Sequence, residues 1–272
     1  MRLKGAVVVI TGASSGIGEA TALAFAARRA NLVLGARRVE KLNAVAQRCR
    51  EKGAPEVTVR RLDVSQRASA TAFVAAAMRD HERIDVLVNN AGLGWTGRLH
   101  EMPEDKVDEL IATNLKGLIA TTQAALPAML SRRRGVIINV SSVLGFRAGP
   151  YSAVYSATKH AVVGLSHALR GELSGTGVKV CVVYPGSTAT EFFAQRPEGP
   201  VGQRYPASWV ANVIVRTARF PRRDAMVLPL RAAHMAEPFL GGLLDHTMGE
   251  ARRKQSPHLV GTGLPPLEEE PG

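Results

Sequence analysis

Short runs of apolar, often β-branched residues alternate along the chain with longer alanine-rich segments. The short runs predict seven strands, at residues 6–10, 32–34, 57–62, 86–88, 135–140, 178–183 and 225–228. The longer segments carry apolar residues at three- and four-residue steps, which predicts helices at residues 19–30, 39–51, 67–80, 106–130, 153–173 and 207–219. This alternation is typical of repeated βα units on a parallel sheet.

The strand pattern also predicts how the sheet is covered. Strands that are apolar on both faces need helices on both sides. We therefore expect an α/β fold, a doubly wound Rossmann-like three-layer sandwich of about seven parallel strands with right-handed crossovers. A chain of 272 residues can bury one large core, so we expect a single domain over residues 1–250.

The pattern changes in the last third of the chain. Residues 195–205 are interrupted by glycine and proline, which is loop composition. Residues 252–272 contain four prolines and the acidic run 268–270, so residues 251–272 are expected to form a flexible tail.

Composition favours a soluble cytoplasmic protein, with 46% hydrophobic and 21% charged residues. The first apolar run ends at Thr11-Gly12, too early for a secretory signal, and no window approaches the roughly 18 apolar residues of a membrane span. Cys49 and Cys181 show no disulfide or zinc spacing and are expected to be reduced. The histidines lack metal spacing, so no metal site is expected.

The net charge of +12 raises the question of a nucleic acid or an anionic membrane as partner. The basic clusters are scattered and have no interleaved aromatic residues, which favours a solvated surface without a nucleic-acid partner. These clusters lie at residues 28–29, 132–134, 222–223 and 252–254.

A glycine-rich turn follows the first strand directly and opens the first helix. Glycine lets the backbone turn sharply and approach a pyrophosphate, while the helix end supplies free N–H groups and a positive dipole. The position of this turn predicts a dinucleotide-binding loop. Its contact residues are Gly12, Ser14, Ser15, Gly16, Ile17 and Gly18.

The end of the second strand bears on which dinucleotide is bound. An acidic side chain there would select NAD(H) by accepting bonds from both ribose hydroxyls, but the strand ends at Ala36 and continues with Arg37 and Arg38. Guanidinium groups can bind a 2′-phosphate, so NADP(H) is preferred over NAD(H), unless these arginines are only an exposed turn. Further contacts are expected from Asp63 and Val64 after the third strand and from Asn90, Ala91 and Gly92 after the fourth.

Candidate chemistry lies further along the chain. Tyr155 and Lys159 are four residues apart in a predicted helix and so share one face. Ser142 follows the fifth strand and is therefore delivered to the edge of the sheet where ligands bind. A neighbouring lysine cation favours tyrosinate and brings a tyrosine pKa near 10 toward working pH. Asn114, inside an apolar helix, is either structural or part of a proton relay.

These motifs together resemble the short-chain dehydrogenase/reductase family of the single-domain kind. The resemblance covers residues 5–190 and rests on five features in order. They are Thr11-Gly12-x-x-x-Gly16-x-Gly18, Asn89-Asn90-Ala91-Gly92, Asn114 with Ser142, Tyr155-x-x-x-Lys159, and Pro185-Gly186.

The resemblance implies an NADP-dependent oxidoreductase that interconverts a carbonyl and an alcohol. Tyr155 would be the general acid/base, Ser142 would bind the substrate oxygen, and Lys159 would hold the nicotinamide ribose. Asn114 would anchor a water-filled proton path. Pro185 and Gly186 would pack near the nicotinamide, and Thr188 or Thr190 would contact its carboxamide or a phosphate, although the family usually has a branched aliphatic residue at position 188.

The sequence also gives expectations for the substrate and for the oligomeric state. The expected pocket borders, residues 93–95, 144–151 and 187–193, are mainly apolar, which favours a hydrophobic or medium-sized ketone, aldehyde or secondary alcohol. The resemblance implies a homodimer or homotetramer formed through the helices at residues 106–130 and 153–173. A non-catalytic NADP-binding regulatory or scaffold protein is the alternative, although the intact Ser142, Tyr155 and Lys159 argue against it.

Overall fold

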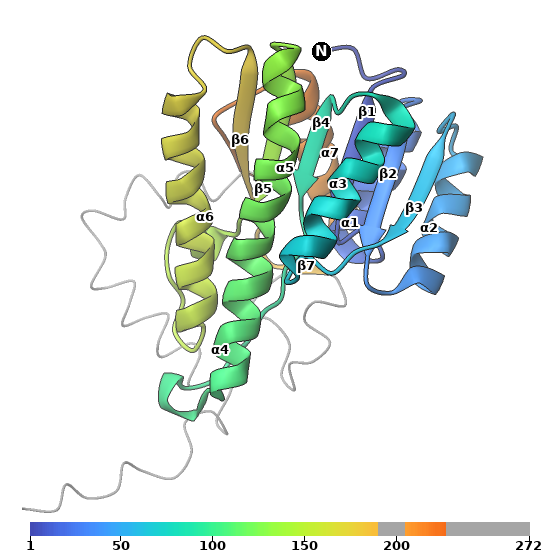
Figure 1. Ribbon diagram of the computed structural model, residues 1–272. Helices are drawn as coiled ribbons and strands as arrows, with labels where there is room; N and C mark the ends of the chain where they lie inside the picture. The colour runs from blue at the N-terminus through green and yellow to red at the C-terminus, as the bar shows by residue number, and fades with distance from the viewer. Residues whose placement is uncertain (190–204, 227–272) are drawn as a thin grey trace, which may run out of the picture.

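The computed structural model describes residues 1–189 and 205–226. In these residues seven parallel strands form one sheet in the order β3-β2-β1-β4-β5-β6-β9, which confirms the predicted parallel sheet (Figure 1). The strands are β1 (Val7–Thr11), β2 (Asn31–Ala36), β3 (Val57–Arg61), β4 (Val86–Asn89), β5 (Gly135–Val140), β6 (Val178–Tyr184) and β9 (Asp224–Met226). The strand order reverses between β1 and β4, and open α/β sheets bind ligands beside such a point.

Helices cover both faces of the sheet and complete the three layers (Figure 1). One face packs against α1 (Gly16–Ala26), α2 (Val39–Glu51) and α7 (Ala207–Arg219). The other packs against α3 (Arg67–His81), α5 (Gly117–Ser131) and α6 (Ala153–Glu172), and α4 (Glu104–Ile111) precedes α5. Alternate residues of β1 belong to the two cores, because successive side chains of a strand point to opposite faces.

Two predicted helices differ from the structure. The helix expected at residues 106–130 is divided into α4 and α5 by a π-helical turn, Ala112–Lys116, which contains Asn114. The helix expected at residues 19–30 spans Gly16–Ala26, because Arg29 adopts a left-handed conformation with φ of 59° and closes the turn after it.

Smaller differences concern the C-terminal part. The last sheet strand is Asp224–Met226, and the rest of the expected strand at residues 225–228 lies outside the described residues. A two-stranded parallel ladder of β7 (Thr188–Ala189) and β8 (Tyr205–Pro206) was not predicted. Thr190, most of the loop at 195–205, and the tail at 251–272 also lie outside the described residues.

Two expectations from composition concern membrane spans and thiols. Within residues 1–189 and 205–226, no helix is long and apolar enough to cross a membrane. Cys49 and Cys181 are free and buried, and burial raises the pKa of the Cys49 thiol to about 12 and that of the Cys181 thiol to about 11. Both thiols therefore stay protonated at neutral pH and are poor nucleophiles.

Candidate active site

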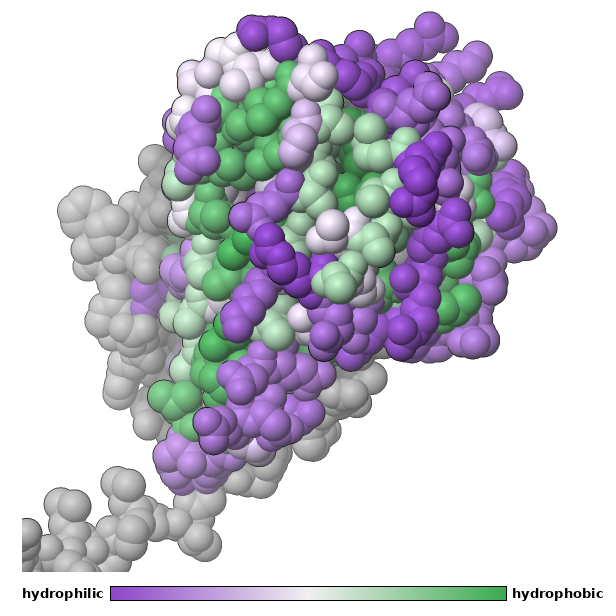
Figure 2. Space-filling view, viewed as in Figure 1, coloured by the Kyte–Doolittle hydropathy of each residue, from purple (hydrophilic) through white to green (hydrophobic). Residues whose placement is uncertain are grey.

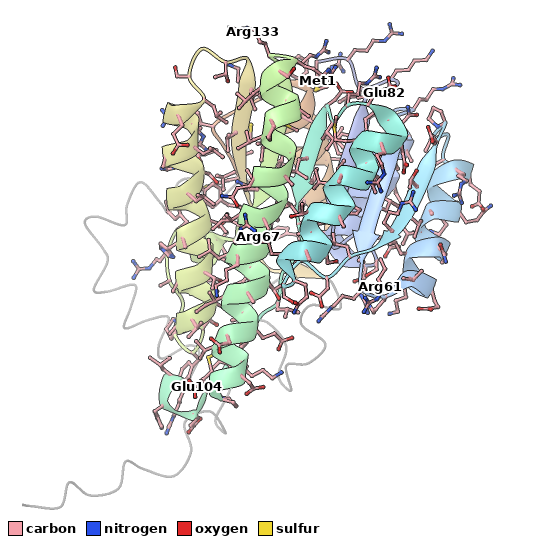
Figure 3. The ribbon with its side chains drawn as sticks, in the orientation of Figure 1. Met1, Arg61, Arg67, Glu82, Glu104 and Arg133 are labelled. Carbon is pink, nitrogen blue, oxygen red and sulfur yellow. The ribbon has the colours of Figure 1, made fainter. Side chains whose placement is uncertain are left out.

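A cleft of about 460 Å³ lies at the carboxyl ends of the strands and is lined by residues that follow β1 to β6. In Figure 3, Arg61 at the end of β3 marks this edge of the sheet, whereas Glu82 and Arg133 lie at the opposite edge. The cleft brings together most of the site residues predicted from the sequence. These are Gly12, Ser14, Ser15, Gly16, Ile17, Arg37, Arg38, Asp63, Val64, Asn90, Ala91, Gly92, Ser142, Tyr155, Lys159, Pro185, Gly186 and Thr188.

Two predicted residues lie behind the lining of the cleft. Gly18 packs against the loop itself, since a Cβ placed there would lie 2.2 Å from the Gly12 carbonyl oxygen. Only a glycine therefore allows α1 to start so close to the loop. Asn114 is 1% exposed and contacts the protein on several sides, as described below.

The glycine-rich loop is clamped to the end of β4. Gly12 has φ of 67°, and a Cβ there would lie 2.7 Å from the Ala91 Cα. The Asn90 side-chain amide donates to the carbonyl oxygens of Thr11 and Gly12, at 3.0 and 3.1 Å. In return, the Thr11 hydroxyl accepts from the main-chain N–H groups of Asn90 and Ala91, both at 3.0 Å. The loop is thus held in shape by the protein itself.

A guanidinium group lies against this loop at the end of β2. Arg37 and Arg38 are both exposed, and Arg38 donates to the Ser15 hydroxyl at 2.6 Å and to the Ser14 hydroxyl at 3.3 Å. Ala36, which precedes them, is buried and carries no acid. The carboxylate of Asp63 accepts from the main chain and hydroxyl of Ser65, at 3.0 and 2.7 Å. This end of the cleft therefore presents positive charge beside a loop shaped for phosphate.

The opposite end holds the three residues expected to carry chemistry. Ser142 follows β5, and its hydroxyl accepts from the Leu144 N–H at 3.1 Å at the start of a short helical turn, Val143–Gly145. Tyr155 and Lys159 lie one turn apart on α6, with the lysine amine 5.7 Å from the centre of the tyrosine ring. All three side chains are largely buried yet line the cleft.

Lys159 is a buried amine, and the part of the cleft that the structure describes places no carboxylate beside it. Its Nζ donates to the Val140 carbonyl oxygen at 3.0 Å. Burial lowers the pKa of the amine to about 8. Among the described residues that line the cleft, Asp63 is the one carboxylate, and it lies at the end of β3. At neutral pH most of the amine is therefore protonated, and this charge favours the ionised form of the tyrosine.

Asn114 joins two parts of the site. Its Oδ1 accepts from the Leu93 N–H at 2.8 Å, and its Nδ2 donates to the Leu93 carbonyl at 2.9 Å and to the Thr158 hydroxyl at 3.1 Å. Thr158 in turn donates to the Tyr155 carbonyl at 2.7 Å. The amide therefore ties the loop after β4 to α6, which supports the structural interpretation of this residue. Gly92 leaves space beside it, since a Cβ there would lie 3.3 Å from Asn114 Oδ1 and 3.5 Å from Lys159 Nζ.

Residues 6–200 match the family model described as short chain dehydrogenase. The chain belongs to the short-chain dehydrogenase family. The 3-oxoacyl-(acyl-carrier-protein) reductase FabG of Thermotoga maritima is 39% identical over 199 residues, which cover 73% of this chain and 80% of the relative.

Two solved structures share both the fold and the sequence. An alcohol dehydrogenase from the archaeon Thermococcus sibiricus, complexed with 5-hydroxy-NADP, superposes with a TM-score of 0.76 at 32% identity, covering 82% of this chain and 96% of that chain. A metagenomic short-chain oxidoreductase in complex with NADP superposes with a TM-score of 0.73 at 36% identity, covering 84% of this chain and 98% of that chain.

Several residues around the site of this short-chain dehydrogenase were missed in the sequence analysis. Thr158 and Ser141 each bond the main chain of α6 close to Tyr155 and Lys159. The serine doublet Ser141-Ser142 was a visible signal, but only Ser142 was considered. Polar residues inside apolar strands were a second signal, since Asn89 and Asn139 bond one another across β4 and β5 at 2.9 Å.

Proposed function

We propose that this short-chain dehydrogenase is an NADP-dependent oxidoreductase that interconverts a ketone or aldehyde and an alcohol by hydride transfer. The observation that carries the proposal is that one cleft joins the glycine-rich loop and Arg38 to Ser142, Tyr155 and Lys159. A cofactor spanning this cleft would reach from the basic group at the end of β2 to the tyrosine on α6.

The residues present fit a dinucleotide with a 2′-phosphate. The clamped loop of Gly12 offers a close backbone approach, and Arg38 and Arg37 offer guanidinium groups where an acid would select NAD(H). Asp63, Val64 and the residues after β4 would border the adenosine, while Pro185, Gly186 and Thr188 would border the nicotinamide. When bound, the nicotinamide donates or accepts the hydride. The NADP bound in one solved relative supports this assignment, as does the NADP analogue bound in another.

The side chains at the other end of the cleft would handle the proton. The Ser142 hydroxyl would donate to the substrate oxygen, and the Tyr155 hydroxyl would give a proton to it or take one from it. Lys159 would favour tyrosinate through its charge and would bind the nicotinamide ribose. A positioned acid/base contributes about 10²- to 10⁴-fold to the rate. Asn114 would hold the loop after β4 in place and border a water path for the proton.

The substrate is proposed to be hydrophobic or medium-sized. Leu93 and Gly94 line the cleft, and the turn that directly follows the lining residue Ser142 carries Val143, Leu144 and Phe146. These side chains offer apolar contacts and no charge that would select an ionic substrate.

The test is NADPH oxidation by the full chain against a panel of carbonyl compounds, namely ethyl acetoacetate, cyclohexanone, benzaldehyde and decanal, with decanol and NADP in the reverse direction. We expect turnover of at least one compound and a fall of about 10²-fold or more in Tyr155→Phe, with NADPH affinity preserved. Undiminished turnover in Tyr155→Phe would contradict the role of the tyrosine. NADPH binding without turnover of any compound would favour the non-catalytic alternative.

A further inference from the structure

Ser141 makes a buried contact with the helix that carries Tyr155 and Lys159. Its hydroxyl donates to the Lys159 main-chain carbonyl oxygen at 2.9 Å, and its side chain is 3% exposed. Ser141 follows β5 and directly precedes Ser142. Both serines line the cleft, but the Ser141 hydroxyl is directed to the main chain of α6.

Val140 and Ser141, two consecutive residues at this strand end, bond the side chain and the main chain of Lys159. The Val140 carbonyl accepts from the lysine amine at 3.0 Å, and the Ser141 hydroxyl donates to the lysine carbonyl at 2.9 Å. Lys159 lies in the middle of α6, where its carbonyl also has a partner one turn ahead in the helix. The bond from Ser141 is therefore not needed to satisfy that carbonyl, and its effect is to fix where α6 lies along the strand.

Gly145 leaves space for the bond between Ser141 and Lys159. Gly145 lies so close that a Cβ there would be 2.2 Å from the Ser141 hydroxyl oxygen and 2.6 Å from the Lys159 carbonyl oxygen. This glycine is needed for space. The turn of residues 143–145 can then fold back over Ser141 while the serine still reaches the helix.

We propose that Ser141 is a positioning residue, whose bond to Lys159 sets the Tyr155 and Lys159 pair in register with Ser142. The inference rests on the proposed function, in which these three side chains act on one substrate oxygen and one cofactor. Misplacing reacting groups by about 1 Å can cost about 10²-fold in rate. A displacement of α6 along the strand by less than about 1 Å is therefore expected to lower turnover while the binding of substrate and cofactor changes little.

Ser166 provides a matched control on the same helix. It is fully buried, its hydroxyl donates to the Val162 carbonyl at 2.6 Å, and it accepts from the Asn139 amide at 2.9 Å. Like Ser141, it ties β5 to α6, but it is seven positions beyond Lys159 and lines no part of the cleft. A general loosening of the contact between strand and helix would affect both variants alike.

The experiment compares Ser141→Ala and Ser166→Ala in the full chain, using NADPH titration and the carbonyl compound of the panel with the highest kcat/KM. We expect kcat to fall about tenfold in Ser141→Ala, with KM and the NADPH Kd within about twofold of the wild type. In Ser166→Ala we expect kcat within about twofold of the wild type. Equal kcat values in the two variants, per folded protein, would overturn the proposal.

A second variant, Gly145→Ala, tests the bond between Ser141 and Lys159 without removing the serine hydroxyl. Gly145→Ala keeps the serine hydroxyl but places a methyl group where that hydroxyl and the Lys159 carbonyl now meet, so kcat should fall at least as far as in Ser141→Ala. If Ser141→Ala did not fold, a wild-type kcat in Gly145→Ala would overturn the proposal. Tyr155→Phe is assayed alongside, because full turnover in that variant contradicts the proposed function itself rather than the role of Ser141.

Discussion

The amine of Lys159 lies 5.7 Å from the centre of the Tyr155 ring while it donates to the Val140 carbonyl oxygen at 3.0 Å. The bond to Val140 holds the amine at the end of β5, and an ammonium group has two further N–H donors. We therefore expect the amine to bind a ribose hydroxyl of the proposed cofactor while its charge acts on the tyrosine.

Lys159→Ala is expected to weaken cofactor binding and to change the pH dependence of alcohol oxidation. It removes the cation beside Tyr155 and one ligand of the proposed cofactor. NADPH binding should weaken, and the rise of alcohol oxidation with pH should move to higher pH, by about 1 to 3 units. The measurement is kcat for decanol oxidation against pH. Lys116→Ala, which changes an exposed lysine, is the control and should match the wild type. An unshifted profile in Lys159→Ala would be incompatible with the tuning role.

Lys159→Met is expected to raise stability near neutral pH in the protein without cofactor. Burial lowers the pKa of the amine from 10.5 to about 8, so the unfolded chain binds more protons than the folded one between these values. The cost of burying this charge is therefore present below pH 8 and disappears as pH rises toward 10.5.

Unfolding in urea at several pH values tests this expectation. The variant should exceed the wild type by up to roughly 3 kcal/mol in free energy of unfolding at neutral pH, and the gain should vanish near pH 10.5. A variant that is less stable than the wild type throughout this range would show that the amine stabilises the fold.

Cofactor preference should depend on the two arginines after β2. NADPH should bind at least about tenfold more tightly than NADH, which corresponds to about 1.4 kcal/mol. Arg38→Gln should lower NADPH affinity more than Arg37→Gln, because the Arg38 guanidinium is already held by Ser14 and Ser15. Ala36→Asp combined with Arg37→Gln should move the preference toward NADH. Fluorescence titrations provide the dissociation constants, and equal values for the two cofactors in the wild type would count against the assignment.

Assembly through α5 and α6 is expected to bury an apolar face. Figure 2 shows apolar side chains gathered over these two helices, and Leu130 on α5 is 37% exposed. Light scattering at micromolar concentration should give the mass of a dimer or tetramer, and Leu130→Asp should lower that mass. Leu99→Asp, at a 61% exposed position outside both helices, is the control. A wild-type mass of one chain would mean that these faces pack only within the chain.

The sequence was most informative about site residues that directly follow a predicted strand. The glycine-rich turn between β1 and α1 could be placed because Gly12 follows the strand and Gly18 lies in the helix. Ser142 could be placed because it follows an apolar strand. The π-turn around Asn114 could not, since apolar periodicity does not register a one-residue change in helical hydrogen bonding. The bond from Ser141 to Lys159 joins residues 18 apart and depends on how α6 packs on β5, which no local pattern encodes.

Gly18→Ala should disrupt the dinucleotide loop through a contact within the protein. The added Cβ would lie 2.2 Å from the Gly12 carbonyl oxygen and 2.6 Å from the Asn90 amide nitrogen that clamps the loop, so α1 must move away from β1. We expect NADPH affinity to fall by about tenfold or more and the midpoint of urea unfolding to decrease, because overpacking costs about 1 to 3 kcal/mol. Gly171→Ala is the control, since a Cβ at that exposed position on α6 meets no atom within 4 Å. Wild-type NADPH affinity in Gly18→Ala would show that the loop does not need this close approach of the helix.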